Sequence, residues 1–264
     1  LGGVPEIAGL TPNGGRDAKG AWLEWLSLPL LLVVWQGLAL VFMSRLFPGP
    51  IAVGAELWRL ASAGPLLGDL GKTLWRTSLG FALAMGIGTV LGIVLGRVRW
   101  ADRLFSAWLV VGLNLPAIVV AIVVYIWLGL TELALILAVV INKVPLVIAT
   151  VREGVRSFSR DYDELALALR MPLMRRLRLI GLPQLLPFLL AAARTGLSLI
   201  WKIVLVFEVL GSDGGIGYRI SVMFQFFDIT GILAYTAAFV GVVLAFEYGV
   251  LRVLERRWLR WRSS

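Results

Sequence analysis

The sequence predicts an all-α membrane protein that crosses the bilayer six times. Of its 264 residues, 59% are hydrophobic and only 16% are charged, and the mean hydropathy is +0.88. This excess of apolar residues is too large for a soluble domain. The apolar residues also gather in stretches of about 20, the length that a helix needs to cross the hydrocarbon core.

Six candidate spans follow one another along the chain, at about residues 26–47, 74–95, 107–130, 133–151, 184–207 and 229–251. Residues 51–63 are too short and too mixed to cross, so we expect an interfacial helix there, with Trp58 at the level of the headgroups. Residues 1–25 form an N-terminal segment, and residues 26–262 form a single transmembrane domain. A polar loop at about residues 152–183 separates the fourth span from the fifth.

Lysine and arginine set the orientation. With these spans, 17 of the 25 basic residues fall on the side of the two termini and the central loop, five fall on the opposite side, and three lie within spans. Basic residues are retained on the cytoplasmic side, so we expect both termini and the central loop in the cytoplasm. The net charge of +9 then reflects these flanking residues, and we expect no nucleic-acid partner.

The sequence offers no catalytic constellation. It contains no histidine and no cysteine, which excludes His-based triads and imidazole or thiolate metal sites. Gly71-Lys72-Thr73 resembles the end of a phosphate-binding loop, but Leu66 stands where the first glycine belongs and no strand precedes it. A face of small residues instead predicts close helix packing in lipid: Gly80, Ala84, Gly88, Gly92 and Gly96. We expect no cofactor in this chain and no enzymatic activity.

The central loop predicts two short amphipathic helices joined at a bend. The first has an apolar stripe at positions i, i+3, i+4 and i+7, made of Tyr162, Leu165, Ala166 and Leu169. Pro172 suits the first turn of the second helix, whose stripe is Leu173, Leu177 and Ile180. Two such helices outside the lipid offer a surface that a partner protein could bind.

Within this loop the chain reads Glu164-Leu165-Ala166, and Arg170 follows after three residues. After nine more residues comes Ile180, and after one further residue come Leu182 and Pro183. This pattern resembles the cytoplasmic coupling loop of permease subunits of bacterial ABC importers, which runs Glu-Ala-Ala, three residues, Gly, nine residues, Ile, any residue, Leu-Pro. Leu165 replaces the first alanine, and Arg170 replaces the glycine that permits a tight bend. The resemblance covers about residues 70–262, including residues 113–130 and 201–220, and is greatest to the nitrate, sulfonate and taurine branch.

The resemblance implies a non-catalytic, multi-pass subunit of a type I importer in the bacterial inner membrane. The implied partners are two copies of an ATPase, which bind ATP and Mg²⁺, a second permease subunit, expected to be identical, and a periplasmic solute-binding protein. The implied solute is a small anion such as nitrate, a sulfonate or taurine, moved by alternating access. The alternative is an ion- or proton-coupled secondary transporter without an ATPase, which predicts internal repeats and acidic relays; the sequence shows no convincing repeat.

Polar residues inside the spans are candidates for the translocation path, because a charge in lipid is costly. Pro116 breaks or kinks the third span, and Pro145, with Asn142, interrupts the fourth in the same way. In the fifth span, two cations lie eight residues apart and share one face of the helix. The candidates for the path are Asn114, Lys143, Arg194, Ser198, Trp201, Lys202 and Glu208.

Two interpretations of the buried cations stay open. Lys202 and Arg194 face a water-filled cavity, or they pair with carboxylates of another helix, namely Glu247 or Glu208 of the partner chain. Glu208 itself is expected to have a structural or a gating role. Residues 211–217 are rich in glycine and predict a flexible connection on the outer side, with docking of an external partner as the weaker option.

Overall fold

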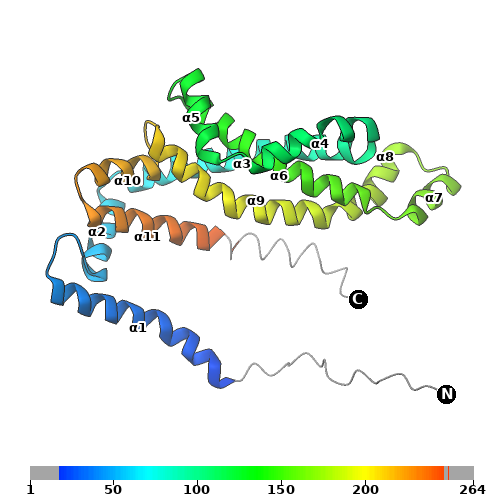
Figure 1. The fold of residues 1–264 in the computed structure, drawn as a ribbon. Coiled ribbons are helices and arrows are strands. Elements are labelled where there is room, and N and C mark those ends of the chain that lie inside the picture. The colour runs from blue at the N-terminus through cyan, green and yellow to red at the C-terminus, as the bar shows by residue number, and fades with distance from the viewer. Residues whose placement is uncertain (1–17, 247–248, 250–264) are drawn as a thin grey trace, which may run out of the picture.

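The computed structural model describes residues 18–246 and residue 249, and within them every regular element is a helix. The helices form an elongated bundle, with α10 and α2 near one end and α7 and α8 at the other (Figure 1). We call these the α10 end and the α7 end. The elements are α1 (Ala18–Phe42), α2 (Pro50–Ser62), α3 (Leu66–Arg97), α4 (Arg99–Asn114), α5 (Ala117–Leu128), α6 (Glu132–Arg156), α7 (Arg160–Ala168), α8 (Leu173–Arg176), a π-helical turn (Leu177–Gly181), α9 (Leu182–Leu210), α10 (Ile216–Gln225) and α11 (Ile229–Phe246).

Helices α3 and α6 form the most extensive contact of the bundle and run parallel. Each glycine of the α3 stripe lies against the valine 59 positions later: Gly80 on Val139, Gly88 on Val147, Gly92 on Val151 and Gly96 on Val155. A methyl group in place of each glycine hydrogen would come within 2.5–2.8 Å of the valine side chain. The predicted small-residue face is therefore confirmed, and it lets the two backbones approach closely.

The third predicted span is broken, as the proline predicts. Helices α4 and α5 meet at an angle of 98°, and the break falls at Leu115 and Pro116, whose ψ angles of 123° and 127° are extended. Proline disfavours the helical conformation of the residue before it. The two helices both pack against α6.

The predicted interruption of the fourth span is wrong. Helix α6 continues from Glu132 to Arg156 through Asn142, Lys143 and Pro145. Neighbouring helices can accommodate a proline inside a membrane helix, and here Gly112 of α4 leaves room for its ring: a Cβ at Gly112 would lie 2.9 Å from Cγ of Pro145.

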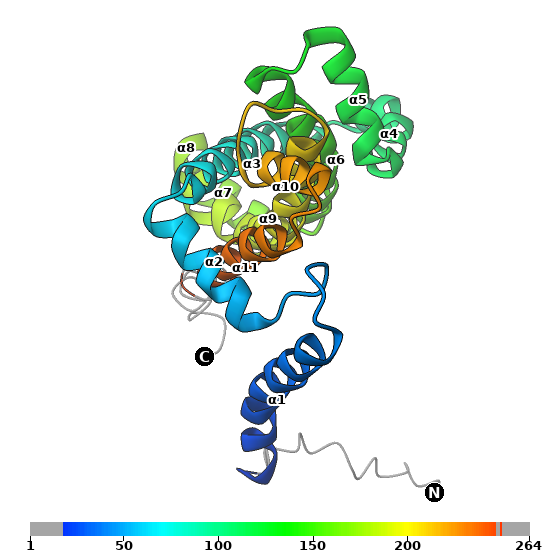
Figure 2. The ribbon, with the colours of Figure 1, turned by 90° about the vertical axis from the view of Figure 1, so that its left-hand side faces the viewer.

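Four helices of the described residues are long and apolar enough to cross a membrane: α3, α6, the continuous helix Met174–Leu210, and α11. The bent pair α4 and α5 makes a fifth span if it is counted as one, and Leu26–Phe42 of α1 is apolar but shorter. Helix α1 stands apart from the bundle (Figure 2) and packs mainly against α2. The count of six spans, the position of both termini and the extension of the last span to residue 251 stay predictions, the last lying outside the described residues.

Only the first of the two predicted loop helices is a separate element, as α7. The second, α8, passes without a break through the π-helical turn into α9. Pro183 has no amide hydrogen and cannot donate to Leu179, and the wider turn is closed by the amide of Leu182, which donates to the carbonyl of Leu177. The surface loop is therefore shorter than predicted, and its second half is the start of a long helix.

The turn after α7 depends on Arg170, the residue that replaces the glycine of the motif. Its φ of 45° is left-handed, the conformation that glycine adopts without strain. The amide of Met171 donates to the carbonyl of Ala166 at 2.9 Å, which is the six-residue hydrogen bond of a Schellman C-cap. The arginine therefore keeps the bend that the motif expects of glycine.

Replacing Gly92 by leucine should separate α3 from α6. Its Cβ would lie 2.7 Å from Cβ of Val151 and 3.1 Å from the carbonyl oxygen of Ile148, so we expect a loss of about 2 kcal/mol or more by overpacking. Gly86→Leu is the matched control, because a Cβ there meets nothing within 4 Å. Thermal unfolding in detergent measures both variants, and an equal melting temperature for the two would contradict the packing.

Arg170→Gly should strengthen the turn, because a left-handed non-glycine residue costs about 1 kcal/mol. Hydrogen exchange of the peptide that contains Met171 should slow in this variant. Arg170→Ala is the control, since alanine carries the same backbone strain, and its exchange should match that of the parent. Faster exchange in the glycine variant would show that the arginine side chain itself holds the turn.

Candidate transport and coupling sites

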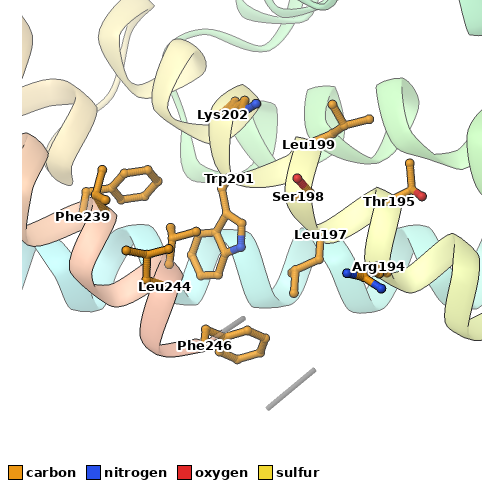
Figure 3. Close-up of a pocket in the computed structure, with 12 residues that line it drawn as sticks. Arg194, Thr195, Leu197, Ser198, Leu199, Trp201, Lys202, Phe239, Leu244 and Phe246 are labelled. Atoms are coloured by element: carbon orange, nitrogen blue, oxygen red, sulfur yellow. The ribbon is translucent and has the colours of Figure 1, made fainter. Parts of the chain in front are cut away.

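A groove of about 580 Å³ lies between α9 and α11 and brings together four of the predicted path residues. Arg194, Ser198 and Lys202 come from successive turns of α9, and all three are exposed (Figure 3). The opposite wall is apolar and is supplied by α11, with Phe239, Val240, Val243, Leu244 and Phe246. Among the described residues that line it there is no carboxylate.

Trp201 anchors the groove to the bundle. Its side chain is only 4% exposed and packs edge-to-face against two rings of α11, with centroids 6.1 Å from Phe239 and 5.9 Å from Phe246. Such aromatic pairs stabilise beyond their buried area. Trp201 therefore fixes the turn of α9 that carries Ser198 and Lys202 (Figure 3).

Lys202 makes no hydrogen bond or ion pair with any residue that the structure describes. Of the two carboxylates considered for it, Glu208 is occupied within its own chain, as described below, and Glu247 lies outside the described residues. The geometry of the described part thus favours a cation that faces an open groove.

Asn114 and Lys143 lie away from this groove. Asn114 is exposed at the break between α4 and α5, where its side-chain amide donates to the carbonyl of Val110 at 2.8 Å. Lys143 is 6% exposed, and the offset of 59 that pairs the glycine stripe with α6 places Ala84 opposite it. Neither residue lines this groove, so the assignment of Asn114 and Lys143 to the translocation path stays a prediction.

Glu208 belongs to a buried ionic network at the α10 end that sequence reasoning missed. The guanidinium of Arg76 is 1% exposed and reaches three carboxylates on different parts of the chain. Its Nε donates to Glu132 at 2.9 Å, its Nη1 to Glu208 at 2.9 Å, and its Nη2 to Asp213 at 2.9 Å. The sequence signal for it is a polar stripe at the start of an otherwise apolar helix: Asp69, Thr73, Arg76 and Thr77.

The prediction that residues 211–217 are a flexible connection is wrong, because hydrogen bonds of the same network fix their backbone. Arg76 donates to the carbonyl of Gly214 at 2.6 Å, and Glu208 accepts from the amide of Gly217 at 2.9 Å. The amide of Gly215 donates to Asp69, and that of Ile216 to the hydroxyl of Thr73. Gly214 and Gly215 have φ angles of 157° and 98°, so the glycines serve a tight turn.

The coupling-loop residues lie at the opposite end of the bundle, on and after α7. Ala166 is buried, whereas Tyr162, Leu165 and Leu169 of the same predicted stripe remain 50–60% exposed. Glu164 is also exposed. The helix thus presents apolar side chains that nothing in the described part of the chain covers.

The remaining motif residues connect this surface to the membrane helices. Ile180 lies in the π-helical turn, and Leu182 and Pro183 begin α9. One residue later, the side-chain oxygen of Gln184 accepts from the amide of Ser159 at 3.0 Å, which ties the start of α7 to the start of α9.

In the described residues no group of three or more carboxylates is arranged to hold a metal ion.

Comparisons with known proteins identify the family. The family model described as "Binding-protein-dependent transport system inner membrane component" matches residues 88–260. A protein named as an aliphatic sulfonates transport permease, SsuC of Bacillus subtilis, is 29% identical over 98% of each chain. The riboflavin transport system permease RibX of Chloroflexus aurantiacus is 31% identical over 91% of this chain and 92% of its own. The nitrate import permease NrtB of Synechococcus elongatus is 25% identical over 73% of each.

The fold is also known from a solved structure. An inward-facing form of the MetNI methionine ABC transporter matches with a TM-score of 0.60 at 19% identity, covering 71% of this chain and 95% of that one. The resemblance seen in the coupling loop is therefore confirmed over most of the chain. The protein belongs to the binding-protein-dependent transport system inner membrane components and is a multi-pass permease subunit of an ABC importer, in the branch that includes the sulfonate and nitrate permeases.

Proposed function

We propose that this permease forms the path of a small anionic solute through the bacterial inner membrane. The observation that carries the proposal is the exposed Lys202 in the groove between α9 and α11, where no carboxylate stands among the described lining residues. Lys202 supplies the charge that attracts the anion, and Arg194, about 12 Å away along α9, adds to the positive potential of the same groove. Nitrate, a sulfonate or taurine, which all carry an anionic group, fit this requirement.

A second copy of the chain completes the path. An exposed ammonium group in a membrane helix is costly unless it faces water, and the groove is open on one side in the single chain. A symmetric pair that brings two such grooves together would enclose a water-filled path lined by cations of both copies. A homodimer is therefore the simplest assembly that the groove supports.

Energy and solute come from further subunits at the two ends. Two ATPase subunits, which bind ATP and Mg²⁺, bind the exposed apolar stripe of α7 in the cytoplasm, and a periplasmic binding protein delivers the solute at the α10 end. The basic residues that flank the α7 end support this orientation. This chain itself hydrolyses nothing.

The helical continuity of residues 174–210 supports a route for coupling. A displacement of α7 passes to the start of α9 through the hydrogen bond between Ser159 and Gln184. Because no loop interrupts the helix between Gln184 and Lys202, the displacement reaches Lys202 as a rigid-body movement of α9. The ATPases can thereby reorient the groove without touching it.

Lys202→Met should strongly impair uptake while leaving the assembly intact. The methionine keeps most of the side-chain volume but removes the charge, so uptake of nitrate, taurine and an alkanesulfonate in proteoliposomes should fall at least about tenfold, the equivalent of 1.4 kcal/mol. Lys202→Arg is the control and should retain most of the uptake. Parental uptake by the methionine variant, or full activity of the permease reconstituted without an ATPase, would refute the proposal.

Leu169→Asp should uncouple the permease from its ATPase. A charge placed in an apolar contact leaves an unpaired group in the interface and should cost about 2 kcal/mol or more, so the ATPase should no longer co-purify. Membrane insertion should be normal, because Leu169 is exposed outside the spans. Asp161→Asn, on α7 but outside the apolar stripe, should keep the ATPase bound; if both variants keep it, α7 is not the coupling helix.

A further inference from the structure

A second groove lies at the α7 end, away from the path between α9 and α11, and it shares Ile180 and Leu182 with the coupling motif. Its polar part has a volume of about 370 Å³ and contains Arg97 and Arg176. Its more apolar part, of about 440 Å³, contains Ile93, Leu182 and Leu185, with Arg178 at its edge toward the α7 end. The two parts share Arg97, Val155, Phe158, Leu177 and Gly181, so they form one continuous groove, which we call the amphipathic groove.

Two arginines of the amphipathic groove, Arg97 and Arg178, differ from the arginines around it. The neighbouring Arg152 and Arg156 are neutralised by ion pairs with Asp102 and Glu153. Arg97 and Arg178, by contrast, make no ion pair or hydrogen bond with any described residue. The planar guanidinium group is well suited to bind phosphate oxygens through two hydrogen bonds.

The amphipathic groove lies where a membrane helix leaves the lipid. Arg97 is the last residue of α3, and Trp100 just beyond it is 69% exposed, as is typical of aromatic residues at the headgroup level. The residues found only in the apolar part include Ile93, one turn deeper on α3, and Leu182 and Leu185, deeper on α9. The arginines therefore lie at headgroup depth and the apolar floor at the depth of the acyl chains.

We propose that the amphipathic groove binds one anionic phospholipid of the leaflet at the α7 end. The phosphate of the headgroup is held by Arg97 and Arg178, and an acyl chain lies along Ile93, Leu182 and Leu185. Charge and depth together select a lipid over a soluble phosphate, which would leave the apolar half empty. Basic pockets between membrane helices commonly hold anionic headgroups. This inference goes beyond the transported solute and does not depend on it.

Gly181 keeps the amphipathic groove open. It lines both parts, and a Cβ at this position would meet only Cδ2 of Leu177, at 3.8 Å. A large side chain can therefore be placed there without straining the backbone, whose φ is −66°. Gly181→Phe fills the groove and leaves every arginine in place.

Native mass spectrometry of the full chain, purified with the subunits that accompany it, tests the proposal. The protein is exchanged into equal amounts of phosphatidylglycerol and phosphatidylcholine, and the lipids retained are counted. We expect one tightly retained phosphatidylglycerol per chain. Each of Arg97→Gln and Arg178→Gln should weaken its retention about fivefold, the equivalent of about 1 kcal/mol per basic residue, and Gly181→Phe should abolish it.

Matched control variants distinguish lipid binding in the groove from lipid binding to the basic surface around it. Arg103→Gln removes an exposed arginine at the same end, and Gly86→Phe adds a ring at an open position of α3; both should retain the lipid as the parent does. Four outcomes would each overturn the proposal. The lipid could be lost equally in Arg103→Gln, or retained fully in Gly181→Phe. Phosphatidylcholine could be retained as well as phosphatidylglycerol, or inorganic phosphate at millimolar concentration could displace the lipid. A lipid absent from the intact assembly would show that protein fills the groove.

Discussion

The buried guanidinium of Arg76 is the constraint on which the α10 end depends. A charge in a membrane helix is tolerated only when hydrogen bonds and opposite charges replace its hydration. Arg76 obtains them from Glu132 at the start of α6, from Glu208 near the end of α9 and from Asp213 in the following loop. Glu132 is far in the sequence from Glu208 and Asp213, so satisfying this one side chain fixes the start of α6 relative to the end of α9 and the loop that follows it.

The rest of the bundle builds on this fixed end. The glycine stripe of α3 continues the contact with α6 from Gly80 to Gly96, toward the α7 end. Helix α9 leaves the network at Glu208, carries the groove at Lys202 and reaches the coupling loop without interruption. A helix held at one end by charge and joined at the other to an exposed apolar surface is a suitable mechanical element for a transporter.

Local sequence signals predicted the local features well. The small residues at every fourth position specify close packing by their size alone, and Pro116 specifies a break because it acts on its own backbone. The motif around Glu164 located the loop between the fourth and fifth spans, and the left-handed Arg170 shows that the bend survives without glycine. The break predicted at Pro145 is absent, because the effect of a proline inside a membrane helix depends on the neighbouring helices. The sequence does not show which helices pack against α6.

The features that sequence reasoning missed are pairings over long distances. Counting basic residues did not single out Arg76, and nothing local links it to Glu208, 132 positions away. Similarly, the glycines of residues 211–217 signal conformational freedom, yet Asp69 and Thr73 accept hydrogen bonds from the amides of Gly215 and Ile216. The spacing of α9 placed Arg194, Ser198 and Lys202 on one face and left open whether that face meets water or a carboxylate. For Lys143 the sequence indicates the depth in the span but not the face of the helix.

The parallel arrangement of α3 and α6 has an electrostatic consequence. Helix dipoles that point the same way place both positive ends together and both negative ends together. Asp69 and Glu132 stand in the two first turns, and Arg97 and Arg156 in the two last turns, so each pole meets side chains of opposite sign. Two aligned dipoles side by side repel each other, and these four side chains offset that repulsion at both ends of the pair.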